Sequence, residues 1–340
     1  ATPIIGEEAE HLYVFQRTPN WSIPARNGPL PTEELKKIKQ SYRTLRKSQR
    51  QLPLAAQKPP NRQSAFDVVD AERNNIYEKF WGIGGLSFLG AFKDIPTDTE
   101  ANETAKNFVT QKIKQMVDDV DLVEKLVPEH YLGCKRPCSD TGYYSSFNRP
   151  NVSLIDARDE PILHFTEDGI ITKAKEYKLD AVVFATGFDA MTGSLDKIDI
   201  RGLQNLPLKE KWQAGPKTYL GLGTSGFPNL FIITGPGSPS VLANMVVGIE
   251  HHVEWIIGCI QHVEERGFNR VQVMRAAEEE WVRHVNDMAE RTLYTTCNNW
   301  YLGANIPGKP RVFMPYIGGF PRYERKCEHV VKEGYTGFQF

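Results

Sequence analysis

The 340-residue sequence lacks an apolar run long enough to cross a membrane. A spanning helix needs about 18–20 consecutive apolar residues. The most apolar helical stretch, which follows Ser240, is broken by Glu250, His251, His252 and Glu254. No segment ahead of the first strand has the pattern of a signal peptide. We therefore expect a soluble protein with no membrane partner.

Cysteine is also scarce. The five residues are odd in number, and no two stand at C-x-x-C spacing. They are Cys134, Cys138, Cys259, Cys297 and Cys327. A set of this kind favours reduced thiols in a cytosolic setting over a disulfide framework. We therefore expect a cytoplasmic protein. We also expect no metal site, since His251 and His252 have no metal-ligand spacing around them.

An excess of charge of either sign is absent too. The 41 Lys and Arg residues balance 42 Asp and Glu residues, for a formal net charge of -1. This balance gives no argument for a polyanionic partner, so we expect no binding of nucleic acid. The basic residues between Lys36 and Arg50 are typical of a solvated helix face. No internal repeat and no G-x-S-x-G nucleophile motif occurs, and the chain is long enough for two globular domains.

The first strong structural pattern is the strand Leu12–Gln16, which ends at Arg17, Thr18 and Pro19. A helix tail before it fits the second half of a βαβ unit. In dinucleotide-binding folds, an arginine at the end of the second strand accommodates the 2′-phosphate of NADP. Arg17 is a candidate for that role, with the Thr18 hydroxyl beside it. The alternative is an exposed arginine before a proline turn.

A long helical stretch follows this strand. Helices are expected at 32–50, 66–81, 97–116 and 121–126. Thr97 and Glu100 have the spacing of a capping box for the third of them. We expect residues 30–130 to form a helical insertion in the domain that begins before the first strand.

Two adjacent cations, Lys135 and Arg136, stand between Gly133 and Pro137 in the loop after the insertion. At the mouth of a nucleotide site, the lysine could meet a phosphate as a point charge. The arginine, which does not lose its proton, could hold an anionic intermediate with paired donors. The alternative is ordinary exposed charge.

Strands return after this loop. They are expected at 151–155, at 162–165 and 170–172 as a hairpin, and at 181–185. The last of these is a continuous apolar run that enters Thr186 and Gly187, a pattern typical of a strand buried on both faces of a parallel sheet. Ligands bind at the carboxyl ends of such strands. The pattern predicts an α/β fold of Rossmann type, although it also fits one more core strand and turn.

The last third of the chain repeats the order of strand, turn and helix. A buried strand is expected at 229–234, followed by the turn Gly235–Ser240 and a helix to about Arg266. Free N–H groups at such a helix start would make an anion- or carbonyl-binding corner. The remaining elements are a strand at 271–274, a helix at 278–292 and a loop at 298–308. Trp300 in that loop fits a packing anchor as well as a ligand contact.

Several of these runs together resemble one enzyme family. They are Leu12–Pro19, Gly133–Pro137, Gly142–Val152, Leu179–Gly193, Thr234–Met245, Trp300–Gly308 and Gly318–Tyr323. Their order along nearly the whole chain resembles that of the flavin-dependent Baeyer–Villiger monooxygenases of the cyclohexanone and phenylacetone monooxygenase type.

The resemblance implies an α/β flavoprotein of Rossmann-like, two-dinucleotide architecture, with FAD and NADPH as cofactors. It implies an NADP-binding domain at 1–29 and 131–187, the helical insertion at 30–130, and the C-terminal part of an FAD-binding domain at 188–340. In that family, reduced flavin captures O2 as a C4a-peroxyflavin. Its attack on a ketone carbonyl gives an ester or a lactone through a Criegee intermediate.

The resemblance also implies roles for individual residues. The implied cofactor contacts are Arg17, Thr18, Lys135, Arg136, Trp300 and Met245, and the implied ketone contacts are Ser240, Val241 and Leu242. The first three would hold the 2′-phosphate of NADPH. Arg136 would be the catalytic residue that stabilises the anionic peroxide and the Criegee intermediate. Trp300 would contact bound NADP+, and Met245 would lie against the flavin.

Some features of the family do not occur in this sequence. They are its Gly-rich FAD and NADP turns, its Phe-x-Gly-x-x-x-His signature and an active-site Asp. Because the chain starts at Ala1 within a helical pattern, we expect the C-terminal part of a longer enzyme, inactive alone. Two alternatives stay open: a flavin monooxygenase that oxygenates N or S atoms, against which Lys135 and Arg136 argue, and a non-catalytic nucleotide-binding fragment. Neither the ketone nor the oligomeric state follows from the sequence.

Overall fold

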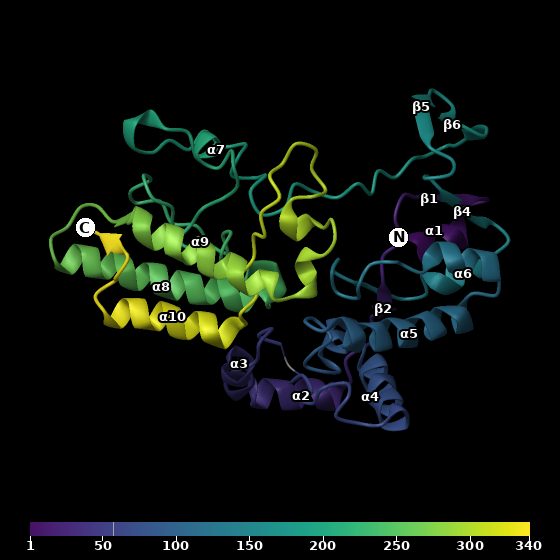
Figure 1. The fold of residues 1–340 in the computed structure, drawn as a ribbon, viewed down its shortest axis with the longest axis horizontal. Helices are drawn as coiled ribbons and strands as arrows, with labels where there is room; N and C mark the ends of the chain where they lie inside the picture. Colours follow the sequence, from purple (N-terminus) through teal and green to yellow (C-terminus); the bar gives the residue numbers. More distant parts are fainter. Residues whose placement is uncertain (57) are drawn as a thin grey trace. The chain divides into compact units, whose positions relative to one another are not determined.

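The computed structural model describes residues 1–56 and 58–340, and the chain divides into two units. The first unit comprises Ala1–Gly28 and Pro60–Gly187, and the second comprises Pro29–Pro59 and Phe188–Phe340. Figure 1 shows the helices and strands of both, coloured along the sequence. Each unit is described by itself below.

The first unit is built on a parallel pair of strands. β1 (Leu12–Gln16) pairs along its whole length with β4 (Val152–Asp156). α1 (Thr2–Glu8) precedes β1 and packs on the pair so closely that a Cβ on Gly6 would lie 2.9 Å from Val152 Cγ2. Figure 1 shows this helix beside the two strands. The predicted strands are confirmed, and a helix on parallel strands is the Rossmann-like α/β arrangement.

A small antiparallel sheet follows β4. It contains β5 (Ile162–Thr166), β6 (Gly169–Thr172) and β7 (Glu176–Lys178) in that order. The predicted hairpin is confirmed as β5 and β6, and β7 adds a third strand. Glycine is required at Gly169, because a Cβ there would lie 1.9 Å from the carbonyl oxygen of Tyr177 on β7.

Helices occupy most of the long connection between β1 and β4. They are α4 (Asp70–Ile83), α5 (Thr99–Met116) and α6 (Val120–Leu126), with short 3-10 segments at Gly85–Gly90 and Tyr144–Asn148. Their common core is aromatic: the rings of Tyr77, Trp81, Phe88 and Phe108 pack with centroids 5.2–6.0 Å apart. The predicted helices are therefore held by ring packing on their inner faces.

Two details of this region differ from the prediction. The predicted capping box of Thr97 and Glu100 does not form, because α5 begins one residue later than that pairing needs. Asp98 caps the helix instead, and its carboxylate accepts a hydrogen bond from Ala101 N at 2.8 Å. In addition, β2 (Ser22–Pro24) pairs in parallel with β3 (Cys138–Asp140), two short strands that the proline-rich sequence did not indicate.

The second unit is mainly helical. Its helices are α2 (Thr32–Gln40), α3 (Tyr42–Arg50), α7 (Leu208–Lys211), α8 (Met245–Glu265), α9 (Arg275–Glu290) and α10 (Phe320–Lys332). Short 3-10 segments lie at Leu203–Asn205, Ser240–Leu242, Leu293–Thr295 and Trp300–Leu302. β8 (Gln272–Val273) pairs antiparallel with β9 (Phe338–Gln339). The single helix predicted at 32–50 is divided at Ser41, whose hydroxyl donates to Lys37 O at 2.8 Å, and α10 was not predicted.

A hydrogen-bond relay ties α8 and α10 to the loops of the second unit. Thr234 N donates to His252 Nδ1 at 2.9 Å, His252 Nε2 lies 2.8 Å from Tyr323 Oη, and Tyr323 donates to Leu220 O at 2.6 Å. Because Tyr323 uses its one proton on Leu220, His252 Nε2 must be the donor to Tyr323. The imidazole is thus neutral, and burial lowers the pKa of His252 to about 3.

Two predicted strands were wrong. Residues 181–185 and 229–234 lie in irregular backbone, and no strand of the described chain pairs with them. Val183 and Phe184 are 69% and 66% exposed, and Ile233 is 46% exposed. An apolar run becomes a buried strand only when neighbouring strands satisfy its backbone groups and cover its side chains. The sequence pattern reports the apolar run but not the presence of those neighbours.

The described residues include no helix that is both long and apolar enough to span a membrane. In the same residues, no group of three or more His, Cys, Asp or Glu side chains is placed to hold a metal ion. Cys138, Cys259 and Cys327 carry free thiols.

Candidate functional site

The first part of the candidate site lies directly after β1. Arg17 and Thr18 are exposed, and the buried Pro19 turns the chain into β2. The pairing of β1 extends past its end, since Ala157 N donates to Gln16 O at 2.8 Å. This contact holds the backbone just ahead of Arg17 against the segment that follows β4. The predicted position of Arg17 at the carboxyl end of a parallel strand is confirmed.

The second part is the loop of Lys135 and Arg136. A fully buried amide anchors it: Asn102 Nδ2 donates to Ile95 O at 2.8 Å and to Leu132 O at 2.9 Å, and Asn102 Oδ1 accepts from Leu132 N at 2.9 Å. Because α5 carries Asn102, the helical core fixes the start of the loop. Gly133 then takes a left-handed conformation with φ +89°, which turns the chain toward Lys135.

Arg17 and Lys135 form a cationic pair without a counter-charge. Burial and the Arg17 guanidinium lower the pKa of Lys135, in that order of size. Neither side chain makes an ion pair with a carboxylate of the described residues. Two neighbouring cations repel each other, so an anion placed between them is stabilised. The two cations have the charge that a phosphate monoester needs, and the Thr18 hydroxyl next to Arg17 in the chain could also donate to it.

Asn20 and His130 support this cationic pair and were missed by the sequence analysis. Asn20 Nδ2 donates to Arg136 O at 2.9 Å, and His130 Nε2 lies 3.3 Å from Asn20 Oδ1. Burial, with further contributions from Lys135 and Lys106, lowers the pKa of His130 to about 4. The ring is neutral at pH 7 and can donate its Nε2 proton to Asn20. No local pattern could reveal this, because the contact joins residues 110 positions apart.

The remaining predicted site residues lie in the second unit. Val241, Leu242 and Trp300 pack in one apolar cluster with Tyr301 and Phe313, so the structure brings these three predicted residues together. The Trp300 and Tyr301 ring centroids are 4.2 Å apart. Trp300 therefore acts at least as a packing anchor for its loop.

Ser240 and Met245 do not belong to that cluster. Ser240 is buried with φ +40°, and its hydroxyl lies 3.6 Å from Met191 Sδ. Met245 is the first residue of α8, and its side chain is 38% exposed. An exposed thioether at the start of a helix is free to contact another surface.

Two side chains fasten the Trp300 loop to the segment after Gly187. Asn305 Nδ2 donates to Phe188 O at 2.9 Å, and Lys309 forms an ion pair with Asp189. Lys309 also donates to Ala190 O at 3.3 Å. The sequence analysis missed Asn305 and Lys309 as well. Their partners lie more than 115 positions away, so no spacing rule could connect them.

The helix start predicted directly after the turn Gly235–Ser240 was wrong. Two N–H groups of the turn are used inside the protein, since Gly237 N donates to Met314 O at 2.6 Å and Ser238 N donates to Gly235 O at 3.1 Å. The helix that follows starts only at Met245 and is capped by the side chain of Asn244. The turn therefore does not open directly into the N-terminus of α8, and two of its amides already have partners in the protein.

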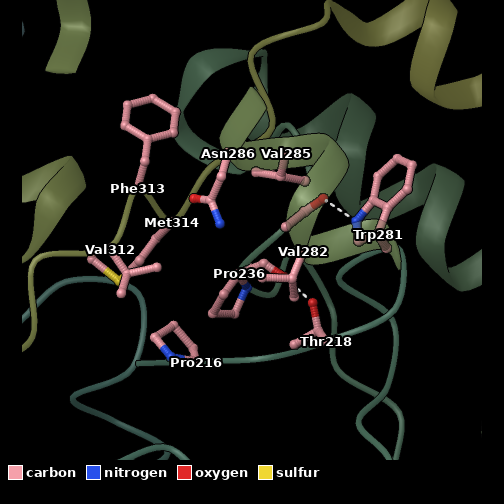
Figure 2. Close-up of a pocket in the computed structure, with 11 residues that line it drawn as sticks. Pro216, Thr218, Pro236, Trp281, Val282, Val285, Asn286, Val312, Phe313 and Met314 are labelled. Carbon is pink, nitrogen blue, oxygen red and sulfur yellow. Dashed lines mark hydrogen bonds between the residues drawn. The ribbon is translucent and has the colours of Figure 1, made fainter. Parts of the chain in front are cut away.

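The turn instead closes one side of a small pocket (Figure 2). In Figure 2, Trp281 donates from its indole nitrogen to Gly237 O at 3.0 Å, and Thr218 donates to Pro236 O. The cavity measures about 20 Å³, which is room for one water molecule. Its walls include Val282, and we assign it to packing rather than to ligand binding.

Comparison with protein-family models gives no match for this chain. Three curated relatives are informative. The chain is 38% identical over 333 residues to cyclohexanone 1,2-monooxygenase from Acinetobacter sp, covering 97% of this chain and 61% of that protein. It is 37% identical over 331 residues to a Baeyer–Villiger monooxygenase from Pseudooceanicola batsensis, covering 96% and 60%. It is 35% identical over 333 residues to phenazine N-monooxygenase from Lysobacter antibioticus, covering 97% and 61%.

A solved structure shares the fold as well as the sequence. The monooxygenase OTEMO, in a crystal structure of its complex with FAD and NADP, superposes with a TM-score of 0.95 at 37% identity. The match covers 99% of this chain and 63% of that one. The chain thus spans about three fifths of the length of the proteins it matches.

Proposed function

We propose a function for this chain from the family to which it belongs, the flavin-dependent Baeyer–Villiger monooxygenases. The proposed reaction is the NADPH- and FAD-dependent insertion of one oxygen atom from O2 next to the carbonyl of a small-molecule ketone, giving an ester or a lactone. Because the chain spans about three fifths of its relatives, the proposal concerns an enzyme of which these residues form one part.

The cationic pair of Arg17 and Lys135 is the observation that carries the proposal. Arg17 lies at the carboxyl end of a parallel strand, where α/β folds bind nucleotides, its charge acts on Lys135, and no carboxylate of the described chain pairs with either. The residues present fit the 2′-phosphate of NADPH, with Thr18 as an additional donor. They do not include a Gly-rich phosphate turn. We therefore assign to them the choice of NADPH over NADH rather than most of the binding energy.

Arg136 is proposed as the catalytic residue. When bound, FAD supplies the chemistry of O2 activation and NADPH supplies the hydride. The proposed contribution of Arg136 is electrostatic, because its guanidinium keeps its proton at any working pH and would stabilise negative charge on the reacting oxygen. Asn20 fixes the backbone of Arg136, and the neutral His130 beyond it adds no competing charge.

We assign the remaining residues by the proposed domains, although Pro29–Pro59 packs in the second unit. Residues 1–29 and 131–187 would bind NADP, with 30–130 as a helical insertion, and 188–340 would belong to the FAD-binding domain. Trp300 would contact NADP+ and Met245 the flavin. Ser240, Val241 and Leu242 would line the ketone pocket; the packing of the last two beside Trp300 supports this assignment.

A ligand pair tests the nucleotide assignment directly. We expect 2′,5′-ADP to bind about 10- to 100-fold more tightly than 5′-AMP, the range expected for two charge-assisted hydrogen bonds. Titration calorimetry on Arg17→Ala and Lys135→Ala should show that this preference is lost. Lys173→Ala, an exposed lysine of the same unit, is the matched control. A preference that survives both substitutions would remove the basis of the proposal.

Oxygenation of nitrogen is the second candidate, because one relative is a phenazine N-monooxygenase. Products formed by the full-length enzyme from a cyclic ketone, a thioether and an aromatic N-heterocycle would decide between the two. A lactone supports the first proposal, whereas an N-oxide or a sulfoxide without lactone supports the second. For the chain alone we expect no ketone-dependent NADPH oxidation.

We also propose a cytoplasmic location for the enzyme.

A further inference from the structure

A second cavity lies in the second unit, apart from the residues assigned above. It measures about 350 Å³ and is bounded by α9, α10 and the segment before β9. The nucleotide and ketone assignments use none of its residues. It is large enough for a single aromatic ring carrying a small substituent.

Aromatic side chains form one wall of this cavity. Trp281 and Tyr316 stack with ring centroids 5.3 Å apart, and the His284 ring lies 5.3 Å from Trp281 and 5.8 Å from Tyr316. Trp281 and Tyr316 are buried, and Trp281 is fixed by its hydrogen bond to Gly237 O. The wall is thus rigid, and the small exposed part of each ring borders the cavity.

Two cationic side chains, those of Arg322 and Lys326, also line this cavity. Arg322 and Lys326 stand four positions apart on α10 and therefore share one face of the helix. In the described chain neither forms an ion pair, and neither does Glu280, the carboxylate that also lines the cavity. Burial lowers the pKa of His284 most, and the charges of Arg322 and Lys326 lower it further. Asp287 and Glu280 raise it, with smaller effects. The cations thus outweigh the acids at His284.

We propose that this cavity binds a small aromatic anion, its ring against Trp281 and Tyr316 and its anionic group between Arg322, Lys326 and His284. Arg322 and Lys326 favour the anionic group of such a ligand, and the apolar lining of the cavity favours its ring. Only a ligand with both parts satisfies both surfaces. A planar oxyanion such as a carboxylate, or a phosphate monoester, suits the arginine fork.

Titration calorimetry on the full chain tests this with phenyl phosphate, benzoate, inorganic phosphate and benzyl alcohol. We expect one saturable site for phenyl phosphate or benzoate. Benzyl alcohol and inorganic phosphate should bind at least 10-fold more weakly. Preference for phenyl phosphate or for benzoate identifies the anionic group. Equal affinity for the charged and neutral ring compounds would overturn the proposal.

Substitutions on α10 locate the site. Arg322→Gln and Lys326→Gln should each weaken binding at least 10-fold. Arg325→Gln, an exposed residue on the same helix that does not line the cavity, should leave it unchanged. Binding should also change the fluorescence of Trp281, and this signal should vanish in Trp281→Phe. If all three charge variants bind equally, or the fluorescence change persists in Trp281→Phe, the ligand binds elsewhere and the proposal is wrong.

Discussion

Arg17 and Lys135 are neighbouring cations, and neither makes an ion pair with a carboxylate of the described residues. Arg46 and Arg50 each pair with glutamates of α8 or α10, and Lys112 pairs with Glu78. The sequence placed Arg17 at a strand end and Lys135 in a loop, but a basic residue in such a position usually has no special role. What makes these two informative is their proximity to each other and the lack of an acid, and both are properties of the folded chain.

Glu278 is a deeply buried carboxylate of the second unit that depends on hydrogen-bond donors for its stability. Its carboxylate is 2% exposed and accepts hydrogen bonds from Lys211, Thr224 and Ser225 at 2.7–3.1 Å. We expect Glu278→Gln to reduce the free energy of unfolding by about 3–5 kcal/mol, because it leaves the Lys211 ammonium half-buried and uncompensated. Urea denaturation measures the difference.

The neighbouring residue supplies the control for that experiment. Glu279 is exposed and pairs with Arg275 on the surface of α9. Glu279→Gln should change the free energy of unfolding by less than about 1 kcal/mol. Similar effects of the two substitutions would show that burial of Glu278 is not the source of its contribution.

Two buried histidines make the stability of the second unit depend on pH. Burial lowers the pKa of His251 to about 4 and of His252 to about 3, whereas an unfolded histidine titrates near 6.5. Between pH 6.5 and 4 only the unfolded chain binds these protons. Stability is therefore fully present above about pH 7 and falls with decreasing pH, by about 1.4 kcal/mol per pH unit for each histidine.

Urea denaturation at pH 7.0 and 5.5 checks this dependence. His252→Gln should make the loss of stability between the two pH values smaller without removing it, because the pKa values of His251, His284 and His130 are also lowered, and the variant should be less stable at both pH values. His164→Gln, which changes an exposed histidine of the first unit, should leave the loss unchanged. An equal loss in the wild type and in His252→Gln would contradict the assignment.

At the scale of elements, the α8 helix exposes an apolar stripe. Val246, Ile249, Val253, Ile257 and Ile260 recur at intervals of three and four and are 38–63% exposed. Such spacing places them on one face of the helix. A contiguous apolar face in water favours association, so we expect the chain to self-associate at micromolar concentration.

Charged substitutions test the role of this stripe. The double substitution Val253→Lys, Ile257→Lys should shift the chain toward the monomer in sedimentation velocity or light scattering. Val120→Lys, at a residue that is 72% exposed outside the stripe, is the control and should have no effect. If the double variant associates as strongly as the wild type, α8 is not the contact face.

The elements that were predicted correctly are those whose pattern is complete within a few residues. β1 carries a β-branched and aromatic run closed by a proline, and the β5–β6 hairpin carries its glycine at the turn. By contrast, 181–185 and 229–234 need neighbouring strands that a local pattern cannot show. The helix α10 was missed because its buried residues, Phe320, Tyr323, Cys327 and Val330, are separated by mostly charged ones.

At the scale of the whole molecule, the sequence predicted which kinds of residue form the candidate site and their order along the chain. It did not predict the contacts that hold them. The resemblance implied that Arg17 and Lys135 share one phosphate and that Arg136 is catalytic, and in the first unit the charge of Arg17 acts on Lys135. It could not show Asn20, His130, Asn305 or Lys309, because these act through partners far away in the sequence. The β5–β6 hairpin, in turn, follows from a local pattern, whereas β7 was not predicted.

The course of the chain through its two units has a consequence for limited proteolysis. Phe184 and Phe188 are 66% and 89% exposed, so chymotrypsin should cut first near Gly187, where the second unit resumes. Residues 29–59 nevertheless belong to the second unit, where Arg50 pairs with Glu254 and Glu324 and Asn244 N donates to Leu54 O. A single cut should therefore yield two bands on a denaturing gel that still co-elute in gel filtration, as a non-covalently complemented pair.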